Sequence, residues 1–163
     1  MTTESIRVGA ESPARTAAVA AAVAGQLRAG DIVLLYGELA AGKTTFVAAA
    51  AAALGSHDHV TSPTFMLAQF YAGGRVPVLH IDTYRLASVA EFRDLGLEEH
   101  LAESATLVEW GGLVEGELPE HLAVTLTADP AAEQGRSITI AGHGARWTGV
   151  PEAIETELLA EAA

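Results

Sequence analysis

The chain has 163 residues, half of them hydrophobic, which is enough for one domain with a substantial core, and we expect a single domain over residues 1–163. It contains no cysteine, which excludes a disulfide scaffold and a thiolate metal site and makes a cytoplasmic enzyme the default expectation. A formal net charge of -12 disfavours direct contact with nucleic acid. The longest apolar run, residues 46–54, is far shorter than the ~20 residues that a membrane span needs.

The chain begins with signals for a strand and a helix. Residues 6–9 fit a short strand. Ser12 and Pro13 are typical of a helix N-cap and a first helical position, and apolar residues recur after them with a helical period. We expect this helix to end at Gly30.

A phosphate-binding loop follows. The apolar run at 32–36 indicates a buried strand, and Gly37, Gly42, Lys43 and Thr44 then fall at the spacing G-x-x-x-x-G-K-S/T. The glycines let successive backbone N–H groups point inward, and a helix that opens at Gly42 directs the positive end of its dipole at the same cavity. Lys43, the single lysine of the chain, can reach the β- and γ-phosphates of a nucleotide, and the Thr44 hydroxyl can ligate magnesium.

The segment after the phosphate loop predicts a helix, a polar turn and a hairpin. The helix should end at Gly55. Residues 61–64 form a constrained, hydroxyl-rich turn, which is either a switch loop over the γ-phosphate or an ordinary turn before a strand. Strands at 64–71 and 76–81 are joined by a short glycine turn. They should therefore pair antiparallel as a β-hairpin insertion at 64–81 and make the sheet mixed.

Two acidic residues stand at predicted strand ends. Asp82 closes the run VPVLHID, where a carboxylate can hold magnesium or orient water, although aspartate there is also a common turn residue. Glu109 closes a second strand, and Trp110 follows it as either a core aromatic or a lid over the site. Ligands of an open α/β sheet bind outside the carboxyl ends of its strands, so Glu109 and Asp82 should converge on Thr44.

The remaining chain predicts a short helix, a hairpin and a last helix. Ser88 and Glu91 form a capping box for the short helix. Strands at 122–127 and 137–141 form a C-terminal hairpin, and an amphipathic helix follows it. Together these elements predict an α/β fold of three layers, the P-loop NTPase fold, in which helices flank a mixed sheet.

Five motifs in this order match a known family. They are GELAAGKTTF at Gly37, TSPTF at Thr61, HIDTYRL at His80, LGLEEHL at Leu95 and VEWG at Val108. The phosphate loop alone is shared by many ATPases, whereas the combination of SPTF, HIDTYR and EWG is specific. Over nearly its whole length the chain resembles the TsaE (YjeE) family, the small ATPase of bacterial tRNA threonylcarbamoyladenosine biosynthesis.

The resemblance implies a Mg2+-dependent ATPase that works with the synthase subunits TsaD and TsaB on the adenosine next to the anticodon, adenosine 37. The chain would meet tRNA only through that complex, and no membrane is implied. The positions implied for contact with ATP are Glu38, Leu39, Ala40, Ala41, Gly42, Lys43, Thr44, Thr45 and Trp110, with Thr16 and Arg136 near adenine. The positions implied for catalysis are Asp82, Glu109, Lys43 and Thr64, and those implied for the metal are Thr44, Glu109 and Asp82.

Three other functions can be weighed against this one. A small-molecule kinase would use the same loop and Mg2+, but kinases of this size usually bring arginines on a lid, and the eight arginines here are scattered. A guanine-nucleotide switch needs a lysine in its base-recognition motif, which a chain whose sole lysine is Lys43 cannot supply. A nucleotide-dependent scaffold, in which ATP binding alone assembles the partners, stays open.

Overall fold

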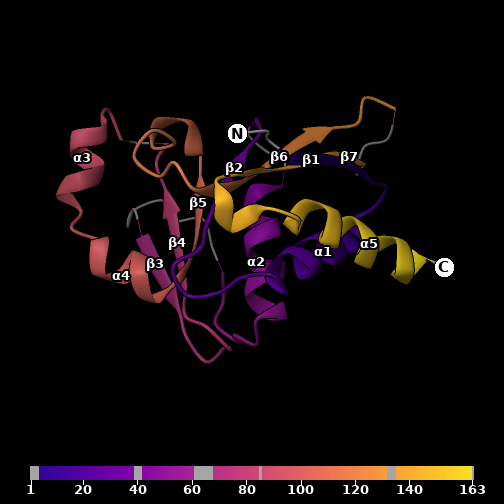
Figure 1. Cartoon of the computed structure of the whole chain (residues 1–163), viewed down its shortest axis with the longest axis horizontal. Coiled ribbons are helices and arrows are strands. Elements are labelled where there is room, and N and C mark those ends of the chain that lie inside the picture. The colour runs from indigo at the N-terminus through magenta and orange to yellow at the C-terminus, as the bar shows by residue number, and fades with distance from the viewer. Residues whose placement is uncertain (1–3, 39–41, 61–67, 85, 132–134, 163) are drawn as a thin grey trace.

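A computed structural model describes residues 4–38, 42–60, 68–84, 86–131 and 135–162, and within these residues the chain forms one seven-stranded sheet with helices packed on it (Figure 1). The strands are β1 (Glu4–Ala10), β2 (Ile32–Tyr36), β3 (Ala68–Tyr71), β4 (Val78–Asp82), β5 (Ala105–Glu109), β6 (His121–Ala128) and β7 (Arg136–His143). The helices are α1 (Pro13–Ala24), α2 (Lys43–Ala53), α3 (Val89–Asp94), α4 (Glu98–Glu103) and α5 (Val150–Ala162), with short 3-10 turns η1 (Gly111–Leu113) and η2 (Ala145–Trp147).

The sheet is mixed, as the sequence predicts. Its strand order is β1-β7-β6-β2-β5-β4-β3. The four strands β6, β2, β5 and β4 run parallel to one another, while β3 pairs antiparallel with β4, and β7 pairs antiparallel with both β1 and β6. The predicted hairpin is confirmed over its described part. Because β2, β4 and β5 are parallel, their carboxyl ends meet at one edge of the sheet.

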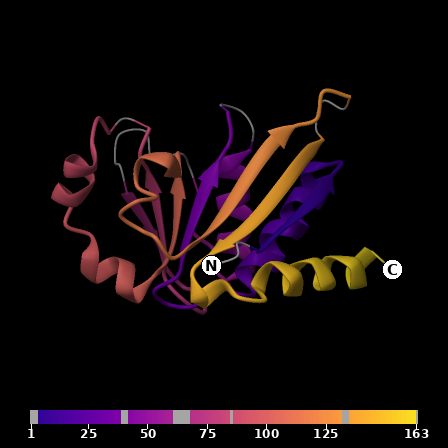
Figure 2. The ribbon, with the colours of Figure 1, turned by 45° about the horizontal axis from the view of Figure 1, so that its top comes forward.

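The helices cover the sheet in layers. One core lies between the sheet and α1, α2 and α5, and a second core lies on the opposite face, where α3, α4 and η1 cover β2, β5 and β4. Figure 2 shows α3 and α4 on one side of the molecule and α1 and α5 on the other. Among the described residues no helix is long and apolar enough to cross a membrane.

The central strand β2 shows why the parallel part of the sheet has continuous apolar runs. Leu34 packs in the core under η1, whereas its neighbours Val33 and Leu35 pack in the core under α2. Both faces of β2 are thus covered, as is usual for parallel strands. On α2 the alanine run serves packing, since Ala50 and Ala51 are buried and small side chains let the helix lie close to the sheet.

The first helix ends earlier than expected. Ser12 caps it as predicted, with its Oγ accepting a hydrogen bond from Arg15 N at 3.2 Å. However, α1 ends at Ala24 and not at Gly30. The guanidinium of Arg75 donates to Ala24 O at 3.0 Å and to Leu27 O at 2.9 Å. These bonds satisfy carbonyl groups at the end of the helix and just beyond it. Arg75, a residue distant in sequence, thus stabilises the end of α1 at Ala24.

Candidate nucleotide-binding site

The turn from β2 into α2 has the backbone of an anion site in its described part. Gly42 adopts a left-handed conformation with φ of 103°, and α2 begins at the next residue, Lys43. The first N–H groups of a helix have no partner within it, and the helix dipole makes that end positive. Phosphate groups therefore fit at the start of α2.

Lys43 is folded back over this turn. Its Nζ donates to Gly37 O at 2.5 Å and to Glu38 O at 3.0 Å, and it lies 4.0 Å from the centre of the Trp110 ring. Burial lowers the pKa of Lys43, while the negative charges of Glu109 and Asp82 act in the opposite direction. The carbonyl groups of Gly37 and Glu38 hold the ammonium group of Lys43 beside the start of α2, where a phosphate group would neutralise its charge.

The predicted metal-binding side chains come together beside Lys43. The Thr44 hydroxyl lies 3.1 Å from each carboxylate oxygen of Glu109. Asp82 stands opposite Glu109 in the register of β4 and β5, and its Oδ1 accepts a hydrogen bond from Tyr84 N at 2.9 Å. Burial raises the pKa of Asp82, and the charge of Glu109 adds to that shift.

This set of donors fits magnesium. One hydroxyl and one or two carboxylates are hard oxygen ligands, and nucleotide sites complete the shell with phosphate oxygens and water. Among the described residues no cluster of three or more His, Cys, Asp and Glu side chains could hold a metal alone. A metal at Thr44 and Glu109 would therefore depend on a ligand that supplies further oxygens.

Trp110 is held in an unusual backbone conformation next to Lys43. Its φ of 62° is the one positive φ at a non-glycine residue in the described part of the chain. Trp110 N donates to Leu35 O at 3.1 Å, and the Thr83 hydroxyl donates to Trp110 O at 2.6 Å. Such strained residues persist only where their surroundings enforce them. The ring is half-buried over the ammonium group, so it is neither a core aromatic nor fully exposed.

A cavity of about 650 Å³ adjoins this ring. The Tyr84 ring lies 5.0 Å from the Trp110 ring, centre to centre, and forms one wall. The residues that line the cavity are Tyr36, Gly37, Glu38, Tyr84, Trp110, Gly112 and Leu113. It therefore opens beside the phosphate-binding turn, on the side of β5.

Sequence reasoning missed the residues that hold Glu109. His80 Nε2 lies 2.5 Å from Glu109 Oε2, and the Thr83 hydroxyl also donates to Glu109 O at 3.1 Å. Behind the histidine, Tyr71 OH lies 2.9 Å from His80 Nδ1. One signal was available for His80, a polar residue in the buried strand β4 that shares a face with Asp82 two positions later.

The other predicted positions are less closely tied to this centre. Glu38 and Thr45 have exposed side chains at the phosphate-binding turn and in the first turn of α2. Thr16 is buried in α1, and Arg136 begins β7, paired in register with Ala10 and Ala128 at the end of β6. Thr16 and Arg136 remain predictions for adenine contact. Leu39, Ala40, Ala41 and Thr64 lie outside the described residues.

Known proteins resemble the chain over most of its length. The family model described as threonylcarbamoyl adenosine biosynthesis protein TsaE matches residues 10–138. Two curated relatives, both described as tRNA threonylcarbamoyladenosine biosynthesis protein TsaE, come from Treponema pallidum and Streptomyces coelicolor. The first is 44% identical over 71% of this chain and 84% of its own length, and the second is 43% identical over 74% and 86%.

A Bacillus subtilis relative with the same description is 37% identical over 83% of this chain and 85% of its own length. The crystal structure of Bacillus subtilis YdiB superposes with a TM-score of 0.78 at 30% identity, covering 96% of this chain and 98% of that one. The predicted P-loop NTPase fold is therefore confirmed, and family and fold are consistent with nucleotide binding. The chain belongs to the TsaE family of tRNA threonylcarbamoyladenosine biosynthesis.

Proposed function

We propose that the chain is the ATPase subunit required for formation of N6-threonylcarbamoyladenosine at adenosine 37 of tRNA, and that it hydrolyses ATP in complex with TsaD and TsaB in the cytoplasm. The observation that carries this proposal is the meeting of Lys43, Thr44, Asp82 and Glu109 at one turn. These residues come from the start of α2 and from two separate strand ends. Their convergence supports a polyphosphate site with a divalent cation.

The roles of the side chains follow from their chemistry. Lys43 and the first amides of α2 would bind the β- and γ-phosphates, after the ammonium group leaves the two carbonyl groups that hold it. Thr44, Glu109 and Asp82 would hold Mg2+, which when bound neutralises charge on the phosphate oxygens. Asp82, opposite Glu109 at the end of β4, would also be suited to orient an attacking water molecule.

Three of the described arginines favour hydrolysis over phosphoryl transfer to a small molecule. Arg75 binds carbonyl groups at the end of α1, and Arg146 pairs with Asp31 at 2.7 Å. Arg93 pairs with Glu117 on the surface. All three are engaged in structural contacts, whereas a kinase lid needs arginines that reach the transferred phosphoryl group.

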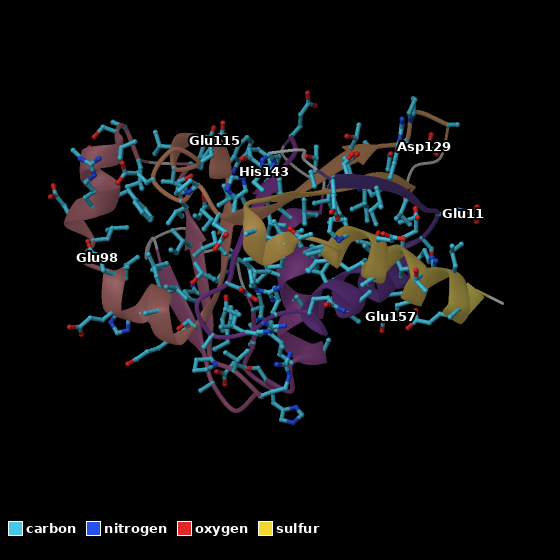
Figure 3. The ribbon with its side chains drawn as sticks, viewed as in Figure 1. Glu11, Glu98, Glu115, Asp129, His143 and Glu157 are labelled. Atoms are coloured by element: carbon cyan, nitrogen blue, oxygen red, sulfur yellow. The ribbon has the colours of Figure 1, made fainter. Side chains whose placement is uncertain are left out.

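The charge of the surface supports an indirect role with tRNA. The chain carries a net charge of -12, and the labelled acidic side chains Glu98, Glu115, Asp129 and Glu157 lie at the periphery of the molecule (Figure 3). Such a surface repels phosphodiester backbones. Partner subunits would therefore bring the tRNA, and the acidic surface suits a partner with a basic patch.

The proposal is tested by measuring phosphate release from ATP by the chain alone and with purified TsaD and TsaB. We expect slow hydrolysis that needs Mg2+ and that changes in rate when the two subunits are added. Hydrolysis and binding that are both indifferent to these partners would contradict the coupling. ATP consumption without free phosphate, dependent on an added acceptor, would indicate a kinase instead.

A second experiment separates hydrolysis from scaffolding. An Asp82→Asn variant should still bind ATP and assemble with TsaD and TsaB but fail to support repeated rounds of tRNA modification. Normal modification of tRNA by this variant would show that ATP binding alone suffices.

A further inference from the structure

A chain of hydrogen bonds runs from the edge of the sheet to the candidate nucleotide site. Tyr71 OH lies 2.8 Å from Gln69 Oε1 and 2.9 Å from His80 Nδ1. The other ring nitrogen of His80, Nε2, lies 2.5 Å from Glu109 Oε2. The two carboxylate oxygens of Glu109 in turn accept a hydrogen bond from the Thr44 hydroxyl, each at 3.1 Å. The contacts thus link three neighbouring strands, β3, β4 and β5, with the first turn of α2.

The middle of this series of hydrogen bonds is shielded from water. His80 has an exposed fraction of 0%, Tyr71 of 3% and Glu109 of 4%. A buried polar group without a partner is costly, so the contacts of His80 with Tyr71 and Glu109 stabilise its buried ring. Both nitrogens of the His80 ring are engaged, which fixes the rotation of the ring as well as its position.

The direction of the bond to Glu109 follows from donor chemistry. An ionised carboxylate only accepts hydrogen bonds, so Nε2 of His80 carries the proton in this contact whether the ring is neutral or charged. The Tyr71 hydroxyl has one proton, so with a charged ring Nδ1 donates to Tyr71 OH and that hydroxyl donates to Gln69 Oε1, whereas with a neutral ring Nδ1 accepts the proton of Tyr71 in place of Gln69 Oε1. In both cases Tyr71 holds Nδ1 of the ring, and Glu109 accepts the hydrogen bond from Nε2.

We propose that His80 is a positioning residue that fixes the carboxylate of Glu109 toward Thr44 and its cation, and that Tyr71 orients His80 for this task. This inference rests on the proposed nucleotide and Mg2+ site. His80 holds Oε2, while both carboxylate oxygens stay 3.1 Å from the Thr44 hydroxyl, so the contact with His80 fixes the orientation of the whole carboxylate toward Thr44. Outer residues that orient a metal-binding carboxylate typically contribute about 10–100-fold to metal affinity.

The variants remove one link at a time. His80→Leu removes the donor to Glu109, and His80→Gln offers an amide N–H in its place. Tyr71→Phe removes the hydroxyl and keeps the ring. Leu79→Ala is the matched control, since Leu79 is a fully buried neighbour of His80 whose side chain packs in the core on the opposite face of β4. This control carries the cost of a core substitution and leaves the hydrogen-bond chain intact.

The first measurement is the affinity for a nonhydrolysable ATP analogue, by calorimetry, with Mg2+ and with EDTA. We expect the ratio of the two affinities to fall about 10-fold or more in His80→Leu, to fall less in Tyr71→Phe and to recover partly in His80→Gln. Leu79→Ala should keep the wild-type ratio. A wild-type ratio in His80→Leu would overturn the inference while leaving the proposed function standing.

The second measurement needs no nucleotide. In the NMR spectrum of the free protein, we expect the Nε2 proton of His80 to be strongly deshielded, to move upfield in Glu109→Gln and to shift in Tyr71→Phe. If the wild type bound no nucleotide, the proposed function would fail, and this spectrum would still decide the positioning role. A resonance that is unchanged in Glu109→Gln would overturn it.

Discussion

Replacing Gly111 with alanine should distort the turn that follows Glu109 and contains Trp110. A Cβ atom at Gly111 would lie 2.7 Å from Leu34 Cβ and 3.3 Å from Leu34 Cα. Leu34 is fully buried in the central strand β2, so it has no room to retreat. Overpacking of this kind lowers the free energy of unfolding by about 1–3 kcal/mol. Replacing glycine raises it by about 0.4–1 kcal/mol, because the unfolded chain loses conformational freedom. We expect a net loss of about 1–2 kcal/mol.

Gly112 supplies the matched control for this measurement. A Cβ atom there would meet Tyr36 Cε1 at 3.9 Å, which is ordinary van der Waals contact. Gly112→Ala should therefore be neutral or slightly stabilising. In urea unfolding, a loss of about 1.5 kcal/mol with a slope of about 2 kcal/mol/M shifts the midpoint by roughly 0.7 M for Gly111→Ala. Equal midpoints for the two variants would refute the reasoning.

Three further predictions concern catalysis and stability. Asp82→Ala and Glu109→Ala should each lose about 10²–10³ in the rate of ATP hydrolysis, measured as phosphate release, and near-normal turnover would contradict their roles. Asp31→Ala should lower the free energy of unfolding by about 3 kcal/mol, because it leaves the guanidinium of Arg146 without its carboxylate; a urea midpoint equal to the wild type would argue against this. Burial lowers the pKa of His121 below its ordinary 6.5, so the unfolded chain binds more protons below that pH and stability should fall as the pH drops through 6.5. His121→Gln should reduce this slope in urea unfolding followed against pH, and an unchanged slope would assign the effect to other groups.

Much of the fold and part of the candidate site could be predicted from local sequence. The turn from β2 into α2 was predictable because glycine, lysine and threonine stand at fixed spacing between a strand and a helix. The meeting of Asp82 and Glu109 was predictable because parallel strands end at one edge of the sheet. The first follows from a short segment and the second from the parallel pairing of strands, and the register of Asp82 with Glu109 and the contact of Thr44 with Glu109 agree with them.

Features that depend on distant segments were not predictable. The end of α1 depends on Arg75, which reaches the last carbonyl groups from the hairpin region, and the apolar period alone suggested a longer helix. The place of His80 depends on how β3, β4 and β5 align, because Tyr71 and Glu109 contact it from the neighbouring strands. The role of Thr64 stays a prediction, since it lies outside the described residues.

The central claim is that the turn at Lys43 binds the polyphosphate of ATP. Calorimetric titration of a nonhydrolysable ATP analogue with Mg2+ into the wild type and into Lys43→Ala tests it most directly. We predict saturable binding by the wild type and a loss of at least about 10-fold in affinity for the variant, because a buried ammonium group that pairs with phosphate is removed. Absence of binding by the wild type, or equal affinity of the two proteins, would contradict the account.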